Sequence, residues 1–351
     1  MEKQKRFIRL FFIEIAVMLA LFIAAVVFVD PFFHYHEPLG GLKAVATKPE
    51  HQVIGSVRNF EYDSIILGSS VAENYNNIWF DETFGGTSIK AIQRSATTVE
   101  LVYYLNEALK EHELKNVYYA LDIASLKDDP SQKFPDATMP LYLYNENVLD
   151  DIKYVFNKDV IFEDIPYMMA VTLLEDYDEG TSYNWAQYKT FSKEGALRTY
   201  NRLSEILNMK PAKDCEETVR ANLNMLEQIV KEEPRTKFRF IFSPYSMLWW
   251  DDCYRNGELK QNLYATRLAA ETLLAYDNVE IYYFQNDTSI VTDLDNYMDV
   301  IHFSDVINHY IVDEMGKGNY RLTLENYEEE IAKMEALAEQ IVGEYILEYY
   351  R

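Results

Sequence analysis

The sequence predicts an α/β protein with a parallel sheet covered by helices on both faces, preceded by an apolar N-terminal helix. Three observations support this. Residues 7–29, FIRLFFIEIAVMLALFIAAVVFV, are nearly all apolar. From residue 62 onward, short apolar runs alternate with longer stretches of helical periodicity, which is typical of βαβ units. The 351 residues are 48% hydrophobic, enough for a sizeable core. We therefore expect one large three-layer α/β/α domain with additions.

The N-terminus predicts a membrane anchor. The basic stretch MEKQKR precedes the apolar run, and residues 15–29 contain no polar side chain. About 20 apolar residues are enough to cross a bilayer, and positive charge keeps the preceding end in the cytoplasm. We interpret residues 1–30 as a cytoplasmic tip and a single transmembrane anchor, with everything after Asp30 extracytoplasmic. A cleaved signal peptide is the alternative, although the apolar run is longer than usual for one.

Residues 31–58 contain prolines and glycines and lack sustained periodicity, so we interpret them as a membrane-proximal stalk. His34 and His36 alternate with aromatic residues there, which favours an aromatic belt at the membrane surface over a metal-binding pair.

The main domain is expected at residues 59–323, with five parallel strands. The strand candidates are Tyr62–Leu67, Ser88–Gln93, Val117–Leu121, Phe238–Phe242 and Val279–Phe284. Helices are expected at 97–112, 215–233 and 258–276. The first of these begins with Thr97 and has Glu100 three residues later, which predicts a capping box.

Two further segments complete the domain. Residues 125–214 interrupt the strand–helix order, and we interpret them as an insertion over one end of the sheet, a candidate substrate lid, with helices near 148–174 and 193–208. Residues 324–351 predict one long amphipathic helix packed on the domain, whose acidic start suits the positive end of a helix dipole.

Composition excludes some functions. The net charge is -24 and no cluster of cations stands out, so nucleic acid is not an expected partner. Cys215 and Cys253 lie in no CxxC or Cys/His cluster, which argues against thiolate-bound metal; a disulfide and two free thiols both remain open. The 28 tyrosines and four tryptophans serve either core packing or stacking on sugars.

Polar residues follow the first and the last predicted strands. Gly68, Ser69 and Ser70 follow the first, and a D-x-x-H motif from Asp299 to His302 follows the last. Ligands bind outside the carboxyl ends of strands in open parallel sheets, so these residues are expected at one edge. Taken alone, a serine at this position is also a good helix N-cap.

The two motifs together resemble the SGNH (GDSL-like) hydrolase superfamily, whose first block is a G-D-S-type turn and whose last block is D-x-x-H. The resemblance implies a flavodoxin-like sheet, with Ser70 as nucleophile, His302 as base and Asp299 as the residue that orients His302. A serine hydroxyl needs a base to take its proton, and the imidazole needs a fixed tautomer.

Two blocks depart from the superfamily pattern. Where a glycine N–H normally faces the oxyanion, this chain has Ser95 and Ala96, whose backbone N–H groups can serve instead. Where the pattern has Gly-x-Asn-Asp, this chain has Asp122 and no asparagine. We expect Asp122 to bind a substrate hydroxyl, or else an oxyanion hole made of Ser70 and other backbone groups; Asn74 is a substitute donor.

Other assignments of these residues remain open. His309, about two helical turns further on, is an alternative base. Asp299, His302 and Asp305 could place metal ligands on one helix face, although such a site would need more ligands than are adjacent.

Within the superfamily, the closer resemblance is to membrane-anchored bacterial proteins that handle acyl groups on cell-envelope polymers, such as D-alanyl lipoteichoic acid transfer proteins and alginate-type O-acetyltransferases. It lies in VDPFFHYH, FSPYSMLWW and DNYMDVIHFS. The second of these places Tyr245, Trp249 and Trp250 as candidates for binding sugar.

The resemblance implies a serine esterase or O-acyltransferase acting on a cell-surface polysaccharide or teichoic-acid-like glycan. It implies no cofactor and no metal, and it leaves a membrane acyl-donor protein as a candidate partner. The alternative function is a catalytically degenerate glycan-binding or scaffold module of a polysaccharide assembly complex.

Overall fold

The computed structural model describes residues 2–134 and 139–350. The chain divides into two compact units. The N-terminal unit comprises residues 1–61 and 136–182, and the sheet unit comprises residues 62–135 and 183–351. The predicted insertion 125–214 is therefore shared between the two units.

The sheet unit has the predicted α/β fold. Five strands run parallel in the order β2-β1-β3-β4-β5, and a short sixth strand pairs antiparallel with β5 at the edge. The strands are β1 (Ser64–Gly68), β2 (Ser88–Ile92), β3 (Asn116–Ala120), β4 (Lys237–Phe242), β5 (Val279–Tyr283) and β6 (Arg321–Leu322). All residues of β1, β2 and β3 are buried, as expected for a parallel sheet covered on both faces. The five predicted strands are confirmed, and β6 was not predicted.

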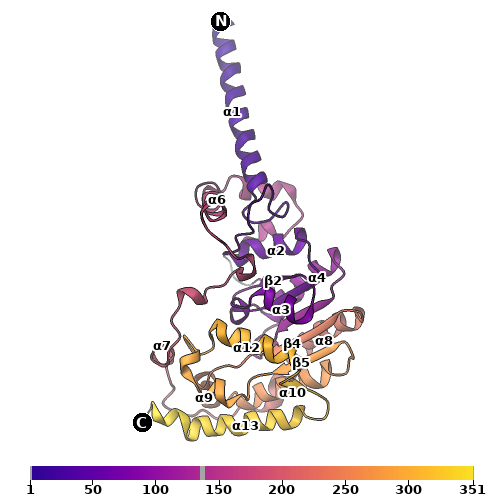
Figure 1. The fold of residues 1–351 in the computed structure, drawn as a ribbon, viewed down its shortest axis with the longest axis vertical. Coiled ribbons are helices and arrows are strands. Elements are labelled where there is room, and N and C mark those ends of the chain that lie inside the picture. The colour runs from indigo at the N-terminus through magenta and orange to yellow at the C-terminus, as the bar shows by residue number, and fades with distance from the viewer. Residues whose placement is uncertain (1, 135–138, 351) are drawn as a thin grey trace. The chain divides into compact units, whose positions relative to one another are not determined.

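Helices form the other two layers (Figure 1). α3 and α12 pack together on one side of the sheet; on the other side, α8 contacts α4 and α10, and α13 contacts α9 and α10. The helices of this unit are α3 (Asn77–Phe84), α4 (Thr98–Glu111), α7 (Lys193–Thr199), α8 (Glu216–Glu232), α9 (Met247–Arg255), α10 (Leu259–Leu273), α11 (Thr288–Val291), α12 (Asp305–Gly316) and α13 (Tyr327–Gly343).

Local sequence explains how several of these helices begin and pack. The predicted capping box of α4 is confirmed: Thr97 accepts a hydrogen bond from the Glu100 N–H, and the Glu100 carboxylate accepts one from the Thr97 N–H. In α8, Val219, Leu223 and Leu226 are buried at helical spacing and form the inner face.

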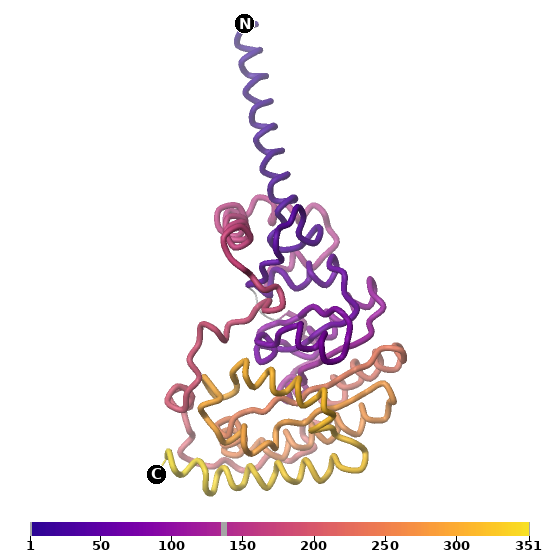
Figure 2. Tube along the Cα trace, in the orientation of Figure 1, coloured from indigo at the N-terminus to yellow at the C-terminus, as the bar shows by residue number. Residues whose placement is uncertain are grey.

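The N-terminal unit contains the predicted apolar helix. α1 spans Glu2–Val29, and by its length and mean hydropathy of 2.9 it could cross a membrane. Most of its side chains are exposed, whereas Val26 and Val29 at its end are buried in the unit. The other helices of this unit are α2 (Pro49–Asn59), α5 (Ile152–Val155) and α6 (Ile165–Leu174). The trace in Figure 2 follows α1 into the loops that join it to α2.

Several predicted elements differ from the structure. The predicted stalk contains α2, whose face from Gln52 to Val57 is buried. The helix expected at 148–174 is broken into α5, a π-helical turn and α6, and the one expected at 193–208 ends at Thr199. The C-terminal helix ends at Gly343, followed by a 3₁₀ turn at Tyr345–Glu348.

The two histidines of the predicted stalk make polar contacts. His36 hydrogen-bonds through Nε2 with the Val27 carbonyl, near the end of α1, and His34 lies 3.2 Å from Asp151.

Candidate active site

The turn after β1 holds the candidate nucleophile. Ser69 is the N-cap of a single 3₁₀ turn, Ser70–Ala72, and α3 begins only at Asn77. Gly68 is required by packing, because a Cβ there would lie 2.6 Å from Ala72 Cβ and 2.9 Å from Ala120 Cβ. The glycine therefore lets this turn lie directly against β3.

The D-x-x-H motif lies in the turn before α12, and hydrogen bonds hold it from two sides. Asp299 Oδ1 accepts from the backbone N–H groups of Ile301 and His302, at 2.9 and 2.8 Å. The Ser246 hydroxyl donates to the Val300 carbonyl at 2.5 Å, which ties the motif to the loop after β4.

The structure brings Ser70 and His302 together across 232 positions of sequence. Ser70 Oγ lies 2.7 Å from His302 Nε2, and His302 Nδ1 lies 2.7 Å from Asp299 Oδ2. Because the carboxylate can only accept, Nδ1 carries the hydrogen of a neutral ring, and Nε2 is left to accept the Ser70 proton. This is the geometry that general-base activation of a serine requires.

Asp299 is electrostatically suited to orient His302. Burial alone would raise the pKa of its carboxyl, but the side-chain and backbone hydrogen bonds from His302, together with the Ile301 N–H, hold that pKa below its usual value of 3.8. Asp299 therefore stays ionised at neutral pH, which keeps the hydrogen on Nδ1.

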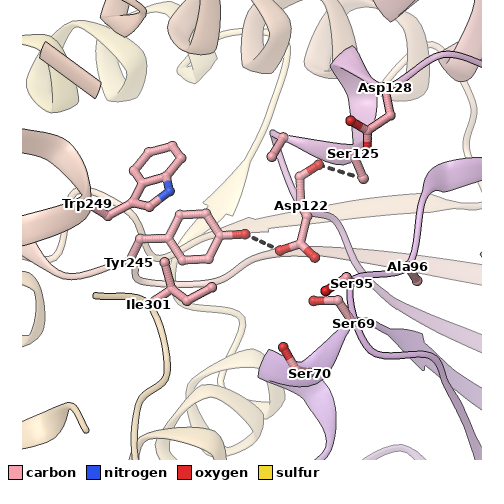
Figure 3. A pocket seen from close by; sticks show the side chains of 11 residues that line it. Ser69, Ser70, Ser95, Ala96, Asp122, Ser125, Asp128, Tyr245, Trp249 and Ile301 are labelled. Atoms are coloured by element: carbon pink, nitrogen blue, oxygen red, sulfur yellow. Dashed lines mark hydrogen bonds between the residues drawn. The ribbon is translucent and has the colours of Figure 1, made fainter. Parts of the chain in front are cut away.

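Ser70 opens onto a pocket of about 230 Å³ (Figure 3). The lining residues come from the segments that follow four strands, β1 to β4, including the first turn of α9, and from the D-x-x-H motif. They are Ser69, Ser70, Ser95, Ala96, Asp122, Ala124, Ser125, Asp128, Tyr245, Trp249 and Ile301. Two carboxylates and no cation are among these lining residues.

Asp122 lies in this pocket beside Tyr245 and Ser69. The Tyr245 hydroxyl hydrogen-bonds to its Oδ1, and Figure 3 shows the carboxyl directed toward the serines. Burial raises the pKa of Asp122 above its usual 3.8, against the opposing effects of Ser69, Tyr245 and His302. The carboxyl is thus shifted toward its neutral form, which weakens the repulsion that an ionised Asp122 would exert on an oxyanion.

The backbone donors predicted for an oxyanion hole differ in availability. The Ala96 N–H donates to the Gln93 carbonyl at 3.0 Å and is occupied. The Ser70 N–H is the first of its 3₁₀ turn and has no acceptor within that turn. Ser95 lines the pocket and has a left-handed backbone conformation, with φ of 52°, which is uncommon for a residue with a side chain. The Ser70 N–H is therefore the better-supported donor, and Ser95 is a second candidate by its place in the lining.

Asn74, a candidate oxyanion donor, is not among the residues that line this pocket. Asn74 is buried, and its Oδ1 accepts from the N–H groups of Trp185 and Ala186, at 3.1 and 3.0 Å. The edge of Trp185 meets His302, with ring centroids 5.5 Å apart at 83°. Trp185 was missed because the insertion lacks a motif; its only sequence signal is a lone tryptophan in the stretch SYNWAQYK.

Other predicted residues lie elsewhere. Trp250 is fully buried in the core, so it is not available to a sugar, whereas Tyr245 and Trp249 line the pocket. His309 stacks on Trp79, with ring centroids 4.4 Å apart, and the ring nitrogen hydrogen-bonded to Ser70 Oγ belongs to His302. Asp305 lies exposed in the first turn of α12.

Both thiols, Cys215 and Cys253, are free, which settles the question left open by the sequence.

Comparisons with known proteins add little. No protein-family model matches the chain, and no curated protein matches it. A solved structure from Streptococcus pneumonia, described as that of "a putative platelet activating factor", aligns with 78% of this chain and 90% of its own, at a TM-score of 0.38 and 12% identity. At that TM-score and identity the likeness carries no argument about function.

Proposed function

We propose that this protein is a serine acyl esterase or O-acyltransferase that is anchored in a membrane and acts outside the cytoplasm on a cell-surface glycan. The observation that carries the proposal is the continuous hydrogen-bonded line from Ser70 Oγ through His302 to Asp299, with both distances at 2.7 Å.

In the proposed reaction, Ser70 Oγ attacks an ester carbonyl while His302 Nε2 takes its proton. The resulting oxyanion is held by the Ser70 and Ser95 N–H groups. His302 then gives the proton to the leaving alcohol as the acyl–oxygen bond breaks, leaving an acyl group on Ser70. Water or a glycan hydroxyl, deprotonated by His302, attacks this acyl-enzyme and restores the free serine. Asp299 stabilises the imidazolium that forms in each step.

The charge of the pocket favours neutral substrates. No cation is among its lining residues, so a phosphate close to Ser70 would find no counter-charge there. Trp249 and Tyr245 offer apolar rings of the kind that pack against sugars. An acylated neutral sugar fits this pocket better than a phosphodiester-linked polymer near the reacting ester.

The properties of α1 support the proposed location outside the cytoplasm. Its apolar length and the basic residues before it support a single-pass anchor with the sheet unit on the extracytoplasmic side. A membrane protein that supplies acyl groups is the partner that a transferase of this kind would need.

The second candidate is a glycan-binding module without catalysis. The observations that favour it are Asp122 in place of an asparagine and the occupied Ala96 N–H. The two candidate functions differ in one respect: only a catalyst would form a covalent acyl group on Ser70.

Hydrolysis of p-nitrophenyl acetate separates the two. We expect the wild-type protein to hydrolyse it, and Ser70→Ala and His302→Ala each to lower kcat/KM by about 10³-fold or more. His309→Ala is the matched control, because His309 is half exposed and contacts Trp79 instead of Ser70. A wild-type rate equal to that of Ser70→Ala would favour the binding module.

A further inference from the structure

The N-terminal unit carries an apolar surface that neither the proposed catalysis nor the core uses. It is contributed by residues in and beside α5 and by the segment that ends in α6. We call the following six side chains the apolar collar, with their exposed fractions: Leu149 83%, Ile152 61%, Phe162 74%, Met169 41%, Leu173 74% and Leu174 83%. Single exposed apolar residues are ordinary on proteins, and the case for the collar therefore depends on where its two parts lie relative to α1.

α6 is the clearest part of the collar. It contains no charged residue from Ile165 to Leu174. Met168 and Val171 face the interior of the unit, and the outward-facing positions are apolar as well. A helix on a water-exposed surface normally presents polar residues on its outer face, so the composition of α6 indicates surroundings other than water.

The collar is attached to the end of α1. α5 contacts α1, and the Tyr154 hydroxyl donates to Asp30 Oδ1 at 2.7 Å, one residue beyond the end of the apolar helix. The rings of Phe32 and Tyr154 also stack, with centroids 5.1 Å apart. α5 is therefore fixed at the point where α1 ends.

α6 is held close to the same point by a short connection. A side-chain carbon placed on Gly40 would lie 3.4 Å from Phe28 Cζ, in the last turn of α1. Three residues further on, the Lys43 N–H donates to Thr172 Oγ1 at 3.1 Å. Three extended residues span about 10 Å, so Thr172, next to Leu173, lies within roughly 20 Å of the last turn of α1. Figure 1 shows α6 beside the end of α1.

We propose that the apolar collar is a membrane-docking surface whose occupant is the boundary between headgroups and acyl chains in the leaflet from which α1 emerges. The inference rests on the membrane anchor of the proposed function but not on the chemistry of Ser70. The acidic residues Glu175 and Asp176 directly follow α6, so anionic lipid would not attract it, and the apolar contacts provide the affinity.

The test uses the full chain in phosphatidylcholine vesicles. Leu173→Cys and Leu149→Cys, each labelled with an environment-sensitive fluorophore, report on the collar, since Cys215 and Cys253 are buried and react slowly. Arg235→Cys, on the sheet unit and 84% exposed, is the control position. Lipid carrying a quencher high on its acyl chain is expected to quench both collar probes at least twofold more than the control.

A second variant makes the test independent of probe behaviour. With the probe at Leu149, the pair Leu173→Glu and Leu174→Glu is expected to reduce quenching, whereas Val306→Glu, an exposed position on α12, is expected to leave it unchanged. Collar probes quenched no more than Arg235→Cys, in chains that remain in the vesicles after washing, would overturn the collar. Loss of the chain from washed vesicles would instead overturn the anchor.

Discussion

His302 differs from an ordinary surface histidine in how many groups fix its ring. Asp299 holds Nδ1, Ser70 holds Nε2, and the edge of Trp185 lies against the ring. Its side chain is only 19% exposed. A ring constrained on three sides stays aligned with the serine, which is the requirement for efficient proton transfer.

Asp299→Asn tests the orienting role. The amide can still accept from the backbone N–H groups of Ile301 and His302, so the turn should stay folded. It can also donate to Nδ1, which would favour the tautomer with its hydrogen on Nε2, the wrong nitrogen for a base. We expect ester hydrolysis to fall by about 10²–10⁴-fold with little change in Tm. A variant that keeps full activity would show that Asp299 is a structural cap only.

Asp122→Asn tests the shifted carboxyl. The raised pKa of Asp122 means that the unfolded chain ionises first as pH rises, so this group destabilises the fold above about pH 4. Asparagine removes that effect and still accepts from Tyr245. We expect the Tm difference between Asp122→Asn and wild type to be small near pH 4 and to grow in favour of the variant toward pH 7.

Asp122→Asn also tests how this side chain affects the oxyanion formed during ester hydrolysis. An amide N–H can donate where an ionised carboxylate would repel, so kcat for a neutral ester at about pH 7 is expected to be unchanged or higher. A tenfold loss would mean instead that the Asp122 carboxylate itself contacts the substrate, as a hydroxyl-binding role requires.

At the scale of elements, Asn74 joins the turn that contains Ser70 to the segment around Trp185. The segment comes from the insertion and supplies the ring against His302, while Asn74 lies four residues after Ser70. Its buried amide oxygen accepts from two backbone N–H groups of the segment. One side chain thus positions a loop that has no regular structure of its own.

Asn74→Ala is expected to lower both stability and activity. The Trp185 N–H loses its acceptor, whereas the Ala186 N–H keeps Asn184 Oδ1, and the change costs about 1–3 kcal/mol of unfolding free energy. Freeing Trp185 should also reduce the rate of ester hydrolysis.

Thr236→Val is the matched control for this variant, because it removes the buried hydrogen bond from Thr236 Oγ1 to the Leu114 carbonyl, just before the amino end of β4 and opposite the site, at a cost of about 1 kcal/mol. A rate that falls equally in both variants would mean that the loss reflects stability alone.

The limits of sequence analysis are physical. The five parallel strands and the α4 cap could be predicted because alternation of apolar runs and capping chemistry are local signals. Gly68, Ser70 and the D-x-x-H motif could be located because the carboxyl ends of parallel strands share one edge. Trp185 and the role of Asn74 could not, because their contacts join segments 111 positions apart with no periodicity. α2 was not predicted because the prolines and glycines of residues 31–58 indicated a loop, although Pro49 is the first residue of the helix.

At the scale of the whole molecule, the sheet unit is stabilised by its own core and contains no cross-link among its described residues. Cys253 is buried, and Asn262 Nδ2 donates a hydrogen bond to its sulfur. The hydroxyl of a serine at this position could accept the same hydrogen bond. The double variant Cys215→Ser and Cys253→Ser is therefore expected to fold, with a Tm within about 5 °C of wild type. Failure to recover folded protein would mean that the thiols have a structural role beyond these contacts.

The central claim is that His302 activates Ser70, and covalent labelling tests it most directly. A fluorophosphonate reacts only with a serine whose proton is removed as it attacks. Intact-mass analysis after incubation is expected to show one adduct per chain on Ser70, with none on Ser70→Ala and with labelling of His302→Ala slowed by about 10³-fold or more. An unlabelled wild-type chain, or equal labelling of wild type and Ser70→Ala, would contradict the account.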